Sequence, residues 1–156
     1  MSLSLFSSLN RHTPELERKI VKFAVGNIMC AVDIMHVREI ILPREISQLP
    51  ADDPSVIGVL DHRDAAIPVV DLHKRFKVSD MRGTKQKWII IAVSEKSIAL
   101  VVEKVFGVTS IHQNQRRDHS ALGSTDVSWA ADVFGDEDGL LFEIDLDMLA
   151  DSVTSS

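Results

Sequence analysis

Short, mostly apolar runs, each bounded by turn-forming residues, fill most of the chain after residue 19. Many of their residues are β-branched, which favours strands over helices at this run length. Glycine, proline, asparagine and aspartate mark the turns between the runs. The sequence therefore predicts strands at residues 20–25, 28–34, 37–42, 56–60, 65–72, 88–93, 97–102, 105–111 and 140–144.

The stretches around these runs carry weaker signals. Residues 73–87 are polar and hold four lysines and two arginines, so they are predicted as a linker that opens with one helical turn at 72–76. Prolines limit residues 49–56 to a turn or one short helix. Residues 145–150 are predicted as a final helical turn, residues 1–17 as a loose leader and residues 151–156 as a tail.

The two halves of the chain resemble one another. At an offset of 68, residues 19–37 align with residues 87–105 and five of the 19 positions are identical. A hairpin of this size cannot bury its apolar face alone, and a second lobe can supply the missing cover. We therefore expect a mostly β domain over residues 18–150, made of two β lobes at roughly 18–80 and 86–150.

Composition and charge narrow the function classes. The chain has 156 residues with 45% hydrophobic and 26% charged residues, which is typical of a globular domain. Its longest uninterrupted apolar run is six residues, so membrane insertion is not expected, and without a secretion signal the expected compartment is the cytoplasm. Residues 88–156 carry a net charge of −8, which disfavours nucleic-acid binding. We expect protein or small-molecule partners.

Motifs for catalysis, cofactors and metals are weak. The seven glycines form no phosphate-binding loop, and the single cysteine, Cys30, lies inside an apolar run, which predicts a small buried side chain rather than a nucleophile. The six histidines show no metal-ligand spacing, so neither a metal nor a cofactor is expected. Residues 136–139 look like part of a calcium loop, but a hairpin turn at Asp138-Gly139 fits them better.

The run Asp61, His62, Arg63 and Asp64 is the most unusual polar cluster, because it interrupts two apolar runs. The plain interpretation is a charged hairpin tip. Its arginine could also grip a carboxylate of a partner, and Asp61 with His62 could form an acid-base pair. The apolar run just before this cluster, residues 56–60, is predicted as a core strand. Val59 is therefore expected inside the core, and Val59→Asp should disrupt the first lobe.

Residues 56–76, VIGVLDHRDAAIPVVDLHKRF, resemble the signature of the CheW-like chemotaxis adaptor family, in which a glycine-valine strand leads through a turn into an I-V-P-V-V-D-L strand. Residues 23–40 and 129–149 are similar to that family's opening and closing segments. The order and spacing of the three segments together carry the resemblance, which covers roughly residues 20–150.

The resemblance implies two small SH3-like β-barrel lobes packed together and a protein that is not an enzyme. It further implies an adaptor between the cytoplasmic helices of a chemoreceptor and a CheA-type histidine kinase. Arg63 matches the family's turn arginine, and Val37 and Glu39 match the segment implicated in coupling. The implied protein-binding residues are Val37, Glu39, Asp61, His62, Arg63 and Asp64.

Two departures from the family pattern concern the turn. Asp61 and Asp64 replace asparagine and glycine, which adds two negative charges and removes the glycine best suited to positive φ. They could hold Arg63 internally, and they point to a divergent chemosensory pathway with an output other than flagellar motility. A small-molecule-binding β domain, with its ligand between the lobes, is the alternative function.

Overall fold

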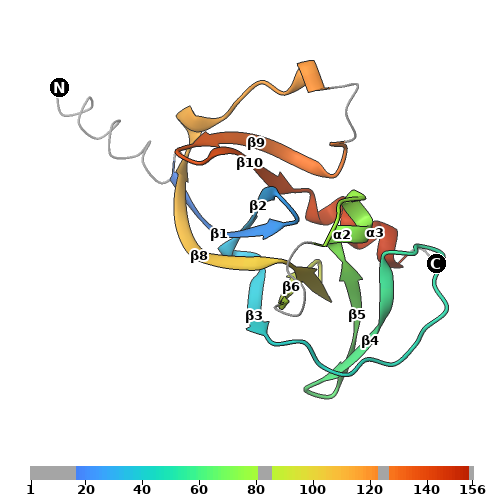
Figure 1. The fold of residues 1–156 in the computed structure, drawn as a ribbon. Helices are drawn as coiled ribbons and strands as arrows, with labels where there is room; N and C mark the ends of the chain where they lie inside the picture. Colours follow the sequence, from blue (N-terminus) through green and yellow to red (C-terminus); the bar gives the residue numbers. More distant parts are fainter. Residues whose placement is uncertain (1–16, 81–85, 123–126, 155–156) are drawn as a thin grey trace.

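The computed structural model describes residues 17–80, 86–122 and 127–154, and within them it contains two sheets of five strands each (Figure 1). The predicted leader, residues 1–17, lies outside these residues except for Glu17. The mostly β fold with two small lobes is confirmed by the two sheets.

The first sheet has the strand order β8-β1-β2-β10-β9. Its central hairpin joins β1 (Glu17–Val25) to β2 (Ile28–Asp33), and its other strands come from the second half of the chain. They are β8 (Lys104–His112), β9 (Ala130–Asp136) and β10 (Gly139–Ile144). The pairing of β10 with β2 is parallel and the other pairings are antiparallel.

The second sheet has the order β3-β6-β7-β5-β4 and repeats this plan. Its central hairpin, β6 (Lys87–Val93) and β7 (Lys96–Val102), comes from the second half of the chain. The first half supplies β3 (Val37–Ile41), β4 (Val56–His62) and β5 (Ala65–Asp71), with β5 parallel to β7. The hairpin residues in the two sheets are the ones that the internal sequence similarity aligned.

The predicted lobe boundaries therefore need correction. Residues 18–80 and 86–150 form the two repeats, but each sheet combines a hairpin from one repeat with three strands from the other. The exchange begins at β3 and β8, which follow the central hairpins along the chain. Strand β3 pairs with β6 of the second hairpin, and β8 pairs with β1 of the first hairpin. Neither lobe is a continuous segment of the chain.

Short helices end each repeat. Helix α2 (Leu72–Phe76) follows β5, and α3 (Leu146–Thr154) follows β10. Asp71 accepts a hydrogen bond from the His73 amide and Asp145 accepts one from the Met148 amide, so an aspartate caps each helix at its start. Both predicted helical turns are present, and α3 extends through four residues of the predicted tail. None of the helices in the described ranges is long and apolar enough to cross a membrane.

The core explains why the central strands are apolar on both faces. Ile98, Leu100 and Val102 of β7 belong to a large cluster that also includes residues of β1, β2, α2 and α3. The alternate residues Ala99 and Val101 belong to a smaller cluster inside the second sheet. A strand buried on both faces needs a continuous apolar run instead of an alternating one. Cys30 is fully buried in the large cluster, as predicted, and burial raises the pKa of its thiol.

Candidate functional site

Polar side chains join the two opposite edges of the second sheet at what we name the β3–β4 seam, consisting of Glu39, Arg44, His62 and Arg63. Glu39 lies on β3, while His62 ends β4 and Arg63 begins the following turn. Glu39 Oε1 lies 2.9 Å from His62 Nε2, and Glu39 Oε2 lies 3.1 Å from Arg63 Nη2. One carboxylate thus ties both edge strands together.

Arg44 determines the role of one ring nitrogen of His62. Its guanidinium Nη1 lies 2.8 Å from His62 Nδ1, and a guanidinium can only donate hydrogen bonds, so Nδ1 accepts. The other nitrogen, Nε2, faces both the Glu39 carboxylate at 2.9 Å and the Arg63 Nε at 3.2 Å. Hydrogen bonds from Arg63 and then His62 hold the pKa of the Glu39 carboxyl below its usual value.

The β4–β5 turn has positive φ angles, which glycine adopts most easily. The family pattern has a glycine in this turn, and this chain has Asp64 in its place. Arg63 and Asp64 have φ values of 52° and 66°, and they form the two-residue connection between His62 and Ala65. This is the left-handed geometry of a tight hairpin turn. It costs residues other than glycine about 1 kcal/mol each, although aspartate tolerates it better than most.

The sequence-predicted site residues divide into three groups. Glu39, His62 and Arg63 meet at the seam. Val37 is half-buried against the large core cluster, and Asp61 and Asp64 are exposed in the hairpin. The guanidinium of Arg63 pairs with Glu39, and its side chain remains 73% exposed.

Two sequence interpretations of this cluster are wrong. The partner of Arg63 is Glu39, where the flanking aspartates were expected. The acid-base pair of Asp61 with His62 is not formed, because both ring nitrogens of His62 face other residues. Sequence reasoning also missed Arg44, which lies in the irregular segment after β3 and carried no motif.

Apolar side chains are exposed on edge strands of both sheets. On and just after β3, Ile40 is 43% exposed and Leu42 is 63% exposed. On β8, Phe106 and Val108 are about half exposed. Exposed large apolar side chains that lie together are typical of protein-docking faces. Strands β3 and β8 are edge strands of different sheets.

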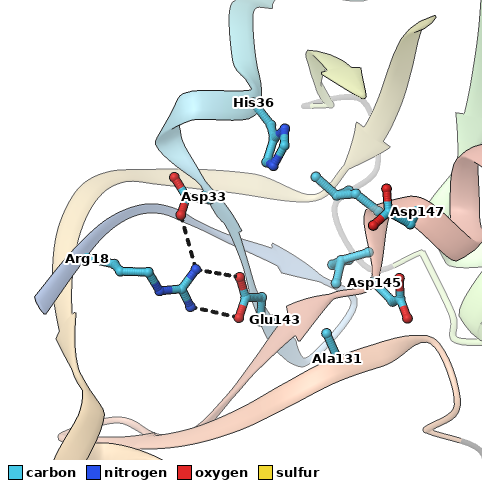
Figure 2. Close-up of a pocket in the computed structure, with 9 residues that line it drawn as sticks. Arg18, Asp33, His36, Ala131, Glu143, Asp145 and Asp147 are labelled. Atoms are coloured by element: carbon cyan, nitrogen blue, oxygen red, sulfur yellow. Dashed lines mark hydrogen bonds and ion pairs between the residues drawn. The ribbon is translucent and has the colours of Figure 1, made fainter. Parts of the chain in front are cut away.

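A polar pocket of about 200 Å³ lies where β1, β2, β10 and the start of α3 meet (Figure 2). Arg18 bridges Asp33 at 3.0 Å and Glu143 at 2.8 Å inside it. These ion pairs already satisfy the arginine, and the pocket is smaller than sites that enclose a drug-sized ligand.

An apolar hollow of about 470 Å³ lies beside the stacked rings of Phe76 and Trp129, whose centroids are 3.9 Å apart. Ile28, Val78, Val127 and Phe142 complete its apolar lining. Its volume and lining lie within the range of small-molecule sites.

Comparison with known proteins gives the family. The family model of the CheW-like domain matches residues 19–154. The chemotaxis protein CheW of Bacillus subtilis is 26% identical over 140 residues, covering 88% of this chain and 89% of that protein. The CheW of Treponema pallidum is 25% identical over 100 residues, which span 61% of this chain and 59% of that protein.

A solved structure agrees in fold. The scaffolding protein TtCheW from Thermoanaerobacter tengcongensis superposes with a TM-score of 0.74 at 24% identity, covering 83% of this chain and 89% of that one. At this identity the match establishes the fold alone. Together with the family match over nearly the whole described chain, it shows that this protein belongs to the CheW-like domain family.

Proposed function

We propose that this protein is an adaptor that couples chemoreceptors to a CheA-type histidine kinase in a chemosensory pathway. The observation that carries the proposal is the CheW-like family match over residues 19–154. The exposed apolar side chains on edge strands of both sheets support it physically, because an adaptor must hold two proteins at once. The protein would act by binding and not by catalysis.

The seam face is the one we assign to the receptor. Its charged centre, Arg63, is exposed, and Ile40 and Leu42 lie on or beside the edge strand that contributes Glu39. Arginine is one of the residues enriched in binding hot spots. The β8 face, with Phe106 and Val108, is assigned to the kinase.

A capture experiment with the full chain, a receptor cytoplasmic fragment and the kinase tests these assignments. We expect Arg63→Glu to weaken receptor capture about tenfold, equivalent to about 1.4 kcal/mol, and to leave kinase capture unchanged. Phe106→Ser should do the opposite. Kinase activity in the three-component mixture should fall with either variant.

Arg63→Glu also places two carboxylates together at the seam, so a second variant separates docking from stability. The double variant Glu39→Arg, Arg63→Glu restores an oppositely charged pair but shows the receptor a reversed charge pattern. We expect it to regain the thermal stability of the wild type and still fail to capture the receptor. Full receptor capture by the double variant would show that Arg63 only supports the turn.

The pathway remains a prediction. The two aspartates of the turn, both exposed, make this surface more acidic than the family pattern and lead us to expect a receptor with a more basic contact surface. A divergent pathway, with an output such as surface motility, fits this difference. Deleting the gene and scoring flagellar and surface motility separately would decide between the outputs.

The alternative, small-molecule binding, has one specific observation in its favour, the apolar hollow beside Phe76 and Trp129. Trp129 would report a ligand there by a change in its fluorescence. Heat and a fluorescence change on titration with metabolite extracts, without any protein partner, would support this function.

A further inference from the structure

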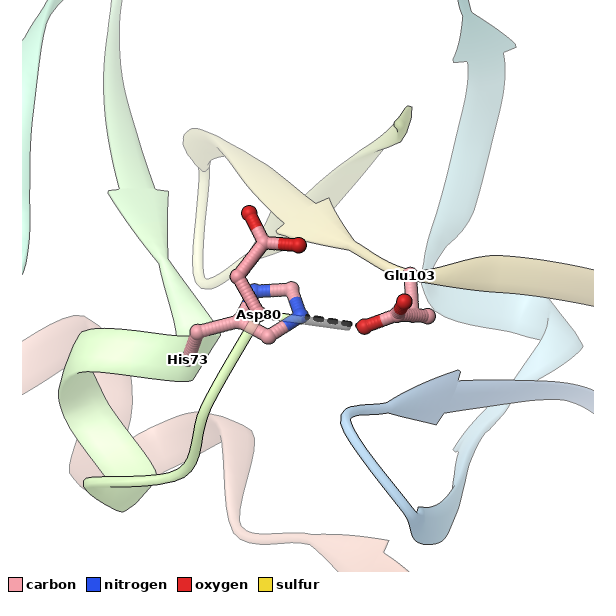
Figure 3. Close-up of side chains that lie close together, drawn as sticks. All are labelled: His73, Asp80 and Glu103. Atoms are coloured by element: carbon pink, nitrogen blue, oxygen red, sulfur yellow. Dashed lines mark hydrogen bonds and ion pairs between the residues drawn. The ribbon is translucent and has the colours of Figure 1, made fainter. Parts of the chain in front are cut away.

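A buried histidine lies between carboxylates at the junction of the two sheets. The side chain of His73 is only 3% exposed. Its Nδ1 lies 3.0 Å from Asp71 Oδ1 and its Nε2 lies 2.9 Å from Glu103 Oε1 (Figure 3). Carboxylates accept hydrogen bonds, and a neutral imidazole has only one N–H. Carboxylates on both sides of one ring favour positive charge at this place, and a cation bound to one ring nitrogen would supply it.

A third acidic side chain completes the cluster. Ligand atoms of His73, Asp80 and Glu103 all lie within 4.8 Å of one another. Figure 3 shows the Asp80 carboxylate beside the imidazole ring, and Asp80 is exposed, which gives an ion a route from solvent. Glu103 is held in place by the amide of Gly26, which donates to its Oε1 at 3.2 Å.

We propose that His73, Asp80 and Glu103 bind a divalent transition-metal ion, with Zn²⁺ as the best match and water completing the coordination. The ion would take the place of the proton on His73 Nε2, which is released to solvent. Nδ1 keeps its proton and donates a hydrogen bond to the Asp71 carboxylate. This proposal is independent of the adaptor function.

The donor set favours this class of ion. One imidazole nitrogen with two carboxylate oxygens suits Zn²⁺ and its neighbours, whereas Mg²⁺ and Ca²⁺ prefer oxygen ligands alone. Tetrahedral bonds of about 2.1 Å place ligand atoms roughly 3.4 Å apart. The present separations, 2.9 Å for one pair and at most 4.8 Å for the others, bracket that value, so small side-chain rotations suffice.

Asp71 supplies the support that histidine ligands have in metal sites. A second-shell carboxylate on the other ring nitrogen fixes the tautomer and orients the ligating nitrogen. Asp71 Oδ1 also accepts the His73 amide at 3.0 Å, so the same oxygen holds both the backbone and the ring. The result is a buried ring with Nε2 directed at Glu103.

The proposal is tested on the full chain by titration with Zn²⁺, followed by calorimetry and thermal unfolding. We expect binding of one ion and a melting temperature that rises with Zn²⁺ concentration, since a ligand that binds only the folded state stabilises it. Mg²⁺ should give neither effect. Absence of Zn²⁺ binding, or equal binding of Mg²⁺, would overturn the proposal.

A matched pair of variants locates the ion. Asp80→Asn removes one exposed ligand and should weaken Zn²⁺ binding at least tenfold, while Asp151→Asn, an equally conservative change on the exposed face of α3, should have no effect. His73→Gln should abolish binding but could also unfold the core. Wild-type affinity in folded Asp80→Asn would show that the ion binds elsewhere.

Nitrogen NMR of the histidine rings gives an independent readout. On adding Zn²⁺, the Nε2 signal of His73 should shift to the position of a metal-bound nitrogen, with Nδ1 remaining protonated. Shifts confined to other histidines would identify adventitious binding and refute the site.

Discussion

Side chains along β4 differ in burial from one residue to the next, and the alternation decides which substitutions matter. Leu60 is 1% exposed inside the core of the second sheet, whereas Val59 is only half-buried. The sequence interpretation that placed Val59 in the core is therefore wrong by one residue. We expect Leu60→Ala to cost about 2–5 kcal/mol and Val59→Ala about 1 kcal/mol. Urea unfolding of the two variants checks this, and equal losses would contradict the alternation.

Asp53 carries a pH-dependent contribution to stability. Its Oδ1 accepts the amide and hydroxyl of Ser55, and its Oδ2 pairs with Arg75. Burial raises the pKa of this carboxyl, but the hydrogen bonds and the arginine outweigh it, and the pKa lies below its usual value. A lowered folded pKa means that the contribution is complete above the unfolded value of about 3.9 and is lost as the pH falls through the folded pKa.

We expect Asp53→Asn, which keeps an acceptor for Ser55 but removes the charge, to be less stable than the wild type at pH 7. The difference should shrink as the pH falls from about 4, where the carboxyl of the unfolded wild type takes up a proton, through the lower pKa of the folded state. Urea unfolding at several pH values measures both. A difference that stays constant down to pH 2 would show that the ion pair with Arg75 contributes nothing.

At the scale of elements, Gly58 lets the segment between β3 and β4 pack closely against β4. Ser47 and Val59 exchange two backbone hydrogen bonds of 2.8 Å, which bring residues 46–47 against the strand. A Cβ at position 58 would lie 2.6 Å from Ser47 O and 2.8 Å from a side-chain carbon of Ile46. The close approach of two backbones, and not the dihedral angles of the strand, thus explains this glycine.

Gly58→Ala should therefore cost about 1–3 kcal/mol through overpacking. Adding Ile46→Ala removes the side-chain clash but not the clash with Ser47 O, so it should recover only part of the loss. Hydrogen exchange at the Ser47 and Val59 amides should speed up in both variants. Full recovery in the double variant would show that Ile46 alone causes the strain.

At the scale of the whole molecule, the exchange of strands between repeats makes the two halves interdependent. Strands β3 and β5 pair with β6 and β7 of the other half, and strands β8 and β10 pair with β1 and β2. The large core cluster also draws on both halves. Neither half can bury its apolar strand faces alone.

Two fragments, residues 1–85 and 86–156, test this interdependence. We expect each to be unfolded alone and the pair to fold when mixed, with β-sheet circular dichroism appearing only in the mixture. A cooperative unfolding transition in either isolated fragment would contradict the exchange.

The candidate site was predictable only in part. The polar run 61–64 stood out because it interrupts two apolar runs, and the resemblance added Glu39. Arg44 was invisible, because it joins the seam only when an irregular segment passes beside His62. His73 was also missed as a cluster, since its partner Glu103 lies 30 residues away and its spacing to any other ligand carries no motif.

The sequence by itself determined the turns, the two short helices and every described strand except β9 (Ala130–Asp136), because these depend on local propensity and on apolar runs bounded by glycine, proline and aspartate. It also determined that the chain contains two related repeats. Only the tertiary structure decided which hairpin each outer strand joins, because the residues of a strand indicate that it is a strand but not which strand it pairs with. The pairing depends on how residues of both halves pack into one shared core. The same packing brings distant segments together to form the seam and the His73 cluster.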